Sequence, residues 1–265
     1  MHDTLQQALS AVSLALLPIL MVQGKQVRRR TPKLPEAAGP NRGWIAARGV
    51  PLRVLVIGES TVAGVGARTH AQALTGQLAA ALARKTERTV QWHAVGRSGA
   101  SAREVHRLLQ PALKAEIADL AVLALGVNDV LHFRSASGWR KDLQHLIATL
   151  RAHLGTLPVL LAPVPQMQHF PALPQPLRGV LGLRARVLDR ASGRLARQMT
   201  RVVHVPLVMD ANAADFFCRD GFHPSEAGYA VWAEQLAAAA AVLLCPAERV
   251  ARTTRPAHRR LEPES

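Results

Sequence analysis

Cysteine is scarce in this sequence, and its scarcity excludes a disulfide framework or a cysteine-rich metal site. Only Cys218 and Cys245 occur, and they fit none of the CxxC or Cys/His spacings that bind metals. With 265 residues, the chain is long enough to bury a substantial core without such staples. We therefore expect one good-sized domain with extensions, and no metal.

Acidic residues and aromatic residues are also few. Asp and Glu number 18 against 33 Lys and Arg, which gives a formal net charge of +15 and suggests an anionic partner, either membrane lipid or nucleic acid. Aromatic residues make up 4% of the chain, and no aromatic platform of the RNA-binding kind is visible. We expect an anionic membrane surface as partner and no nucleic acid.

Charged residues are missing from positions 4–24, which have an apolar centre and are followed by the basic cluster KQVRRRTPK. A membrane-crossing helix needs about 20 largely apolar residues. A cleavable signal would carry its positive charges before the apolar run, so we do not expect one. Residues 1–30 are thus predicted to associate with a membrane, with the rest of the chain on the cytoplasmic side. An amphipathic or core helix, and an exported protein, are the alternatives.

Beyond a Pro- and Gly-rich linker at 31–50, short apolar runs alternate with helical patterns. The runs lie at 51–58, 89–96, 118–126, 157–165 and 202–207, and the helical patterns at 70–86, 102–114, 138–154, 183–199 and 224–244. This alternation predicts an α/β fold over 51–245: a three-layer α/β/α sandwich with a five-stranded parallel sheet. The charged stretch 246–265 lacks periodicity and is expected to be disordered.

The first apolar run ends in GESTVAG, residues 58–64. Ligands of such sheets bind at the carboxyl ends of the strands. The P-loop pattern is absent, and the glycines have the wrong spacing for a dinucleotide site. A nucleophilic Ser60 at the strand-to-helix turn is the remaining functional interpretation, whereas a helix N-cap is the ordinary one.

A nucleophilic serine needs a base, a group that orients the base, and donors for an oxyanion. Asp220 and His223 stand three residues apart in DGFH, where one tight loop can present both side chains. Asn128 follows the third run, in GVND, and offers a side-chain amide. Gly99 follows the second, in SGAS, and offers an unobstructed backbone N–H.

Together these four blocks, GESTVAG, SGAS, GVND and DGFH, resemble the SGNH, or GDSL-type, hydrolase superfamily over residues 51–244. The resemblance implies a flavodoxin-like fold with Ser60 as nucleophile, His223 as general base and Asp220 as its orienting group. It further implies an oxyanion hole formed by Ser60, Gly99 and Asn128, and no cofactor. Glu59 departs from the family's Asp, which puts its local hydrogen bonds in question.

The substrate is less sharply indicated. Residues 164–183 interleave prolines with apolar side chains, including Phe170, Leu173 and Leu177, which could form an acyl-chain wall or an ordinary packed loop. A basic stripe adds to the charge behind the N-terminal segment: Arg190, Arg194, Arg197 and Arg201. We expect a membrane-associated esterase or lipase acting on lipid-like esters such as lysophospholipids. A short-chain carbohydrate O-acetylesterase, a thioesterase and a non-catalytic basic scaffold are the alternatives.

Overall fold

The computed structural model describes residues 17–206 and 215–244, so residues 1–16, Cys245 and the tail 246–265 lie outside it. Cys218 carries a free thiol. The elements follow one another in the order α2 (Leu17–Arg30), β1 (Arg42–Ile45), β2 (Gly49–Gly58), α3 (Leu74–Thr86), β3 (Arg88–Gly96), α4 (Ala102–Ala112), β4 (Leu120–Ala124), α5 (Val127–Leu131), α6 (Ala136–Leu154), β5 (Val159–Leu161), η1 (Met167–His169), α7 (Leu177–Gln198), β6 (Val202–His204) and α8 (Glu226–Leu244).

The sheet has the strand order β1-β3-β2-β4-β5-β6. Strands β2 to β6 pair in parallel, which confirms the predicted sheet of five parallel strands. One edge strand was not expected: β1 pairs antiparallel with β3, with Arg42 opposite His93 and Ile45 opposite Val90. Its four residues lie inside the predicted linker 31–50 and are too few and too exposed to carry a strand pattern. Pairing with β3 is what orders them.

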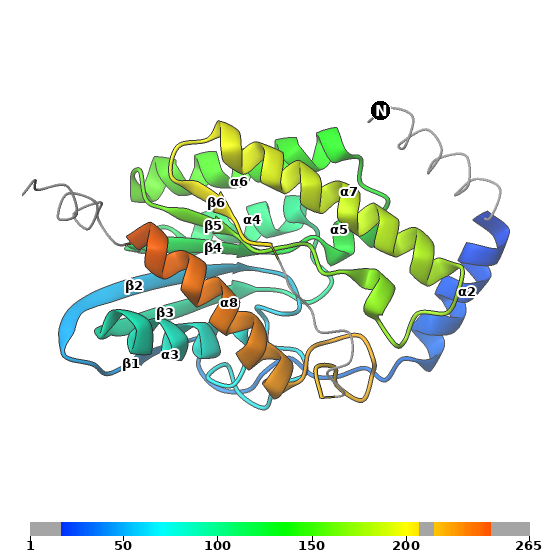
Figure 1. The fold of residues 1–265 in the computed structure, drawn as a ribbon, viewed down its shortest axis with the longest axis horizontal. Coiled ribbons are helices and arrows are strands. Elements are labelled where there is room, and N and C mark those ends of the chain that lie inside the picture. The colour runs from blue at the N-terminus through cyan, green and yellow to red at the C-terminus, as the bar shows by residue number, and fades with distance from the viewer. Residues whose placement is uncertain (1–16, 207–214, 245–265) are drawn as a thin grey trace, which may run out of the picture.

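Helices α3 and α8 cover one face of the sheet, and α4, α6 and α7 cover the other (Figure 1). Neighbouring residues of β2 illustrate the division, since Leu55 and Ile57 belong to the core under α4, α6 and α7, whereas Val54 and Val56 belong to the core under α3 and α8. Burial on both faces explains why the parallel strands are apolar runs without polar alternation. The three-layer α/β/α sandwich is therefore confirmed.

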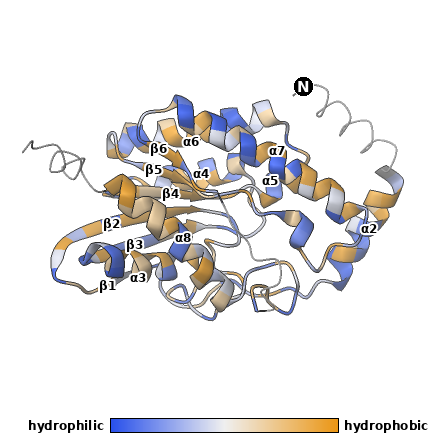
Figure 2. Cartoon of the chain, viewed as in Figure 1, coloured by the Kyte–Doolittle hydropathy of each residue, from blue (hydrophilic) through white to orange (hydrophobic). Residues whose placement is uncertain are grey.

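Helix α8 is long and apolar enough to cross a membrane by length and composition (Figure 2). One of its faces is nevertheless part of the protein core, where Tyr229, Trp232 and Leu236 are buried with the residues of α3 and the sheet. Packing inside the domain thus accounts for the apolar residues of that face.

Helix α2 carries the last residues of the apolar N-terminal segment without interruption into the basic cluster. Leu20 is buried and Val27 partly buried against the core of the domain. Gln23 fixes the beginning of α7, because its Nε2 donates to the Gln175 carbonyl at 2.7 Å and its Oε1 accepts from Leu177 N at 3.1 Å. The helix therefore lies beside the start of α7 (Figure 1).

The chain changes direction across the sheet at β2. Strand β3 lies on one side of β2 and β4 on the other, so the loops that follow these three strands diverge around a crevice at their carboxyl ends. Ser60, Gly99 and Asn128 come directly after β2, β3 and β4. The topology thus brings the three predicted oxyanion donors to the same edge of the sheet.

Candidate active site

Ser60 lies in a turn that starts at the end of β2. Within the described ranges its N–H has no hydrogen-bond partner, whereas its carbonyl accepts from Val65 N at 2.9 Å. Tyr229 of α8 ties the same turn down, since its Oη donates to the Val65 carbonyl at 2.6 Å. The turn therefore holds Ser60 in place and leaves its N–H free to donate.

Gly66 lets this turn approach the loop that carries His223. Its φ is +97°, and a Cβ there would lie 2.5 Å from the Pro224 carbonyl and 2.7 Å from Cys218 Sγ. That loop is closed on itself by Cys218 N, which donates to the His223 carbonyl at 2.8 Å. Only glycine permits both the backbone conformation and the close contact.

Asp220 and His223 form the hydrogen-bonded pair that the DGFH spacing predicts. His223 Nδ1 lies 2.7 Å from Asp220 Oδ2, while Asp220 Oδ1 accepts from Phe222 N at 2.9 Å and His223 N at 3.0 Å. Burial by itself would raise the pKa of Asp220, but these hydrogen bonds outweigh it and lower that pKa. Asp220 is therefore an anion with both oxygens engaged, and it leaves Nε2 of His223 to face the site.

Ser60 and His223 line the same pocket. In the part of the chain that the structure describes, no hydrogen bond joins the Ser60 hydroxyl to His223. Hydrogen bonds between a nucleophile and its base are often long before substrate binds and tighten in the complex.

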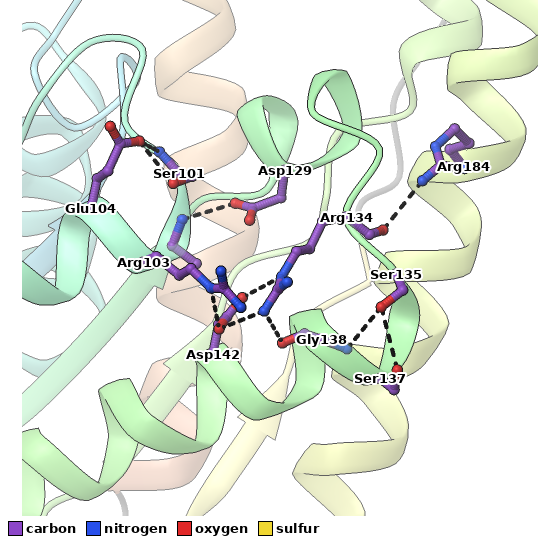
Figure 3. Close-up of polar contacts among 11 residues, drawn as sticks. Ser101, Arg103, Glu104, Asp129, Arg134, Ser135, Ser137, Gly138, Asp142 and Arg184 are labelled. Carbon is purple, nitrogen blue, oxygen red and sulfur yellow. Dashed lines mark hydrogen bonds and ion pairs between the residues drawn. The ribbon is translucent and has the colours of Figure 1, made fainter.

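Gly99 lies in the loop after β3 with a φ of +77°, and a Cβ would meet no atom within 4 Å. Glycine is favoured there by backbone conformation alone. Its N–H has no partner among the residues described. Asp129 holds this loop from the other side, because its carboxylate accepts from Ala102 N, at the first residue of α4, at 2.9 Å (Figure 3).

Asn128 is engaged by the residue beside the nucleophile. Its Nδ2 donates to Glu59 Oε2 at 2.6 Å and to the Ala100 carbonyl at 3.2 Å. Glu59 also accepts from Asn128 N at 3.1 Å and from Val127 N at 2.9 Å. Glu59 stands where the family has Asp, and its local hydrogen bonds are now defined. The Glu59 carboxylate binds the start of α5 and the side-chain amide of Asn128, the predicted oxyanion donor.

Burial is the largest influence on the pKa values of the Glu59 and Asp129 carboxylates. It raises the pKa of Glu59 to about 7, against the lowering effect of the hydrogen bonds from Asn128 and Val127. It also raises the pKa of Asp129 to about 6. Arg134 lowers the pKa of Asp129 only in part, and its guanidinium, like that of Arg103, pairs with Asp142 (Figure 3).

The pocket beside Ser60 is walled by aromatic rings. Phe170 makes edge-to-face contacts with Phe217 and Phe222, at centroid distances of 5.3 and 5.1 Å. The remaining lining residues are Thr61, Val127, Pro165, Phe216, Pro224 and Trp232, with Ser60 and His223 at the reacting end. Four of the five phenylalanines in the chain therefore line one pocket.

Phe170 lines the pocket that contains Ser60 and His223, and its contact with an acyl chain stays a prediction. Leu173 and Leu177, by contrast, are buried in the core and do not belong to the pocket lining. Phe216, Phe217 and Phe222 were not among the predicted pocket residues. A signal for them existed, because three of the five phenylalanines fall within the seven residues 216–222, which overlap the DGFH block.

The basic stripe predicted on one helix face is shorter than expected. Arg190, Arg194 and Arg197 are exposed on α7, but the helix ends at Gln198 and Arg201 lies beyond it with a φ of +56°. Within the described ranges, His, Cys, Asp and Glu form no group of three or more that could hold a metal ion.

A serine beside a buried Asp–His pair, with free N–H groups at the ends of adjacent parallel strands, is the arrangement of a serine hydrolase. The model of the GDSL-like lipase/acylhydrolase family matches residues 56–231. The chain belongs to this family and is a carboxylic ester hydrolase. The resemblance to the SGNH superfamily is therefore confirmed.

Solved structures of other proteins share the fold. TesA superposes with a TM-score of 0.60 at 23% identity, over 72% of this chain and 99% of TesA. A lipase/acylhydrolase from Enterococcus faecalis gives 0.53 at 18% identity, over 74% and 98% of the two chains. A carbohydrate esterase family 2 enzyme from Corynascus thermopiles gives 0.57 at 17%, over 76% and 69%. No curated protein matches the sequence.

Proposed function

We propose that this enzyme hydrolyses esters with an apolar acyl group in lipid-like amphiphiles such as lysophospholipids. The observation that carries the proposal is the aromatic pocket beside Ser60 and His223. Rings of phenylalanine offer contact area to hydrocarbon and no hydrogen bonds to a sugar.

The reaction proceeds through an acyl-enzyme. His223 takes the Ser60 proton as Oγ attacks the ester carbonyl, and Asp220 keeps the imidazole in the required tautomer and stabilises its charged form. The N–H groups of Ser60 and Gly99 and the amide of Asn128 receive the oxyanion. His223 then protonates the departing alcohol, and a water molecule activated by His223 releases the acid.

The cavity inside the pocket is small, about 30 Å³. An acyl chain of more than a few carbons must therefore move the rings or extend out of the pocket. A short-chain carbohydrate O-acetylesterase is the second candidate that this observation favours, and chain length separates the two.

The first experiment is hydrolysis of p-nitrophenyl esters from acetyl to palmitoyl by the full chain and by Ser60→Ala. We expect turnover that Ser60→Ala abolishes, an optimum beyond butyryl, and release of fatty acid from lysophosphatidylcholine. An optimum at acetyl, with deacetylation of acetylated xylan, would replace the lipid proposal with the carbohydrate one. Equal turnover by both proteins would overturn Ser60 as nucleophile.

The outer face of α2 supports a membrane partner. Its first half exposes apolar side chains, with Met21 at 55% and Val22 at 56%. Its second half exposes cations that have no ion pair among the residues described: Lys25, Arg28, Arg29 and Arg30. We propose that this face lies on an anionic membrane surface, with the hydrolase domain on its cytoplasmic side.

Vesicle sedimentation tests this partner. The full chain should bind phosphatidylcholine vesicles only after phosphatidylglycerol is added, and salt should weaken the binding. Replacing the three arginines at 28–30 by Gln should abolish it, whereas the matched triple change at Arg190, Arg194 and Arg197 should not. Equal loss in both variants, or tighter binding to duplex DNA, would favour a general basic scaffold.

A further inference from the structure

We infer that Glu59 is a positioning residue of the oxyanion hole, acting by gripping the side-chain amide of Asn128. The inference deepens the proposed function, because it rests on Asn128 as an oxyanion donor. Glu59 precedes Ser60 in the chain. One short segment therefore supplies both the nucleophile and the group that positions the Asn128 amide as an oxyanion donor.

The two N–H bonds of the Asn128 amide are held unequally. The 2.6 Å contact with Glu59 Oε2 is short and charge-assisted, whereas the 3.2 Å contact with the Ala100 carbonyl is long and neutral. Charge-assisted hydrogen bonds are about twice as strong as neutral ones. The N–H near Ala100 is therefore the one available to an oxyanion, which would replace or share the weak contact with the Ala100 carbonyl while Glu59 keeps the amide plane fixed.

The length and charge of Glu59 both matter for this grip. Three N–H donors converge on its two oxygens, from Val127 N, Asn128 N and Asn128 Nδ2. A glutamine offers one acceptor oxygen and would turn its own NH₂ group toward N–H donors. An aspartate keeps two acceptor oxygens, but its shorter side chain extends less far toward the three N–H donors.

Glu59 is 2% exposed, and it has no ion pair in the described part of the chain. The charged group that acts on it is Asp129, on the short helix α5 that also carries Asn128. A buried carboxylate without a cation is costly for the fold. Such a cost is typical of functional sites, which keep residues that destabilise the fold because the chemistry needs them.

The catalytic benefit is preorganisation. A donor that is already aimed needs no reorientation when charge develops on the substrate oxygen, and this lowers the barrier of the chemical step more than it improves binding. Loss of the grip should therefore lower kcat and leave KM nearly constant.

A double-mutant cycle tests the inference on a soluble p-nitrophenyl ester, with Glu59→Gln, Asn128→Ala and the double variant in the full chain. We expect Asn128→Ala to lower kcat about 10²- to 10³-fold, and Glu59→Gln to lower it roughly tenfold or more with KM unchanged. The double variant should be no slower than Asn128→Ala, because Glu59 acts through that amide. Glu59→Asp, which keeps a carboxylate, should recover part of the rate lost in Glu59→Gln.

Asp129→Asn is the matched control. It alters the neighbouring buried carboxylate, whose hydrogen bond is to Ala102 N and not to the Asn128 amide, so the greater part of its effect should persist when Asn128 is alanine. If Glu59→Gln lowers kcat by the same factor in the wild type and in Asn128→Ala, the inference is overturned. If Glu59→Gln does not fold, the same cycle with Glu59→Asp decides.

The inference and the proposed function fail differently. An Asn128→Ala variant with full kcat would remove Asn128 from the oxyanion hole and overturn this inference, while inactive Ser60→Ala would still support the acyl-enzyme. Full kcat in Glu59→Gln beside an impaired Asn128→Ala would overturn the inference alone.

Discussion

His223 Nδ1 lies 2.7 Å from Asp220 Oδ2, and the other oxygen of the same carboxylate accepts two backbone N–H groups of its own loop. Asp220 thus holds the proposed base by a hydrogen bond and is also the structural centre of the loop that carries it. Because Asp220 serves both purposes, replacing it even by the similar Asn side chain should strongly lower kcat.

Asp220→Asn should lower kcat by roughly 10⁴-fold, because an amide can hold His223 in the wrong tautomer. The matched control is Asp215→Asn, an exposed residue shortly before this loop, and its kcat should be that of the wild type. Both are measured by steady-state hydrolysis of p-nitrophenyl butyrate. An Asp220→Asn enzyme within tenfold of the wild type would contradict the role of Asp220.

Gly66→Ala should lower kcat/KM at least tenfold, because the added Cβ pushes against the Pro224 carbonyl and Cys218 Sγ and shifts the loop of His223. Gly155→Ala is its control. Gly155 also has a positive φ, of +74°, but a Cβ there would meet nothing within 4 Å. Both variants should lose about 1–2 kcal/mol of stability from backbone strain, and Gly66→Ala should lose more because of the close contact, as measured by urea unfolding. Only Gly66→Ala should lose activity, and equal losses in both would refute the close-contact argument.

Phe217→Ala should shift the preferred acyl chain to longer esters. The ring packs edge-to-face on Phe170 and Phe216, and its removal opens the pocket without touching the catalytic pair. A pocket change of this size alters discrimination between chain lengths by about 10- to 200-fold in kcat/KM. Phe133→Ala, at an exposed ring outside the pocket, should leave the preference unchanged. An unchanged preference in Phe217→Ala would place the acyl chain elsewhere.

The buried Glu59 should make stability depend on pH near neutrality. Burial raises its pKa to about 7 from 4.5, so between these values the folded state binds more protons than the unfolded state, and the free energy of unfolding falls as pH rises. The stabilisation is fully present below pH 4.5 and is lost as pH rises through 7. Asp129 adds a similar fall at lower pH, because its pKa is raised to about 6.

Chemical unfolding of wild type and Glu59→Gln between pH 5 and pH 8 measures this effect. The stability of the wild type relative to the variant should fall by roughly 1–3 kcal/mol across that range. Glu104→Gln is the control, because hydrogen bonds from Ser101 lower the pKa of Glu104 and place its titration below this range. A constant difference between wild type and Glu59→Gln would mean that Glu59 does not titrate there.

Much of the fold followed from periodicity. Five apolar runs between helical patterns predicted the parallel strands, because a strand buried on both faces cannot tolerate polar alternation. The strand β1 and the short helix α5 escaped prediction, since four or five residues carry too little pattern. They are ordered by neighbours distant in the sequence, β1 by pairing with β3 and α5 by the carboxylate of Glu59.

The sequence pattern was enough to predict the four loops that carry the site, because each candidate residue follows a strand end and parallel strands end at one edge of the sheet. It also determined the Asp220–His223 pair, since three residues of a tight loop leave little freedom. Which apolar side chains line the pocket followed only from the packing of distant segments, which places Phe217 and Phe222 on the pocket and Leu173 in the core. The tertiary structure alone decided that Glu59 holds Asn128, because a contact across 69 residues depends on how two loops pack and leaves no local pattern.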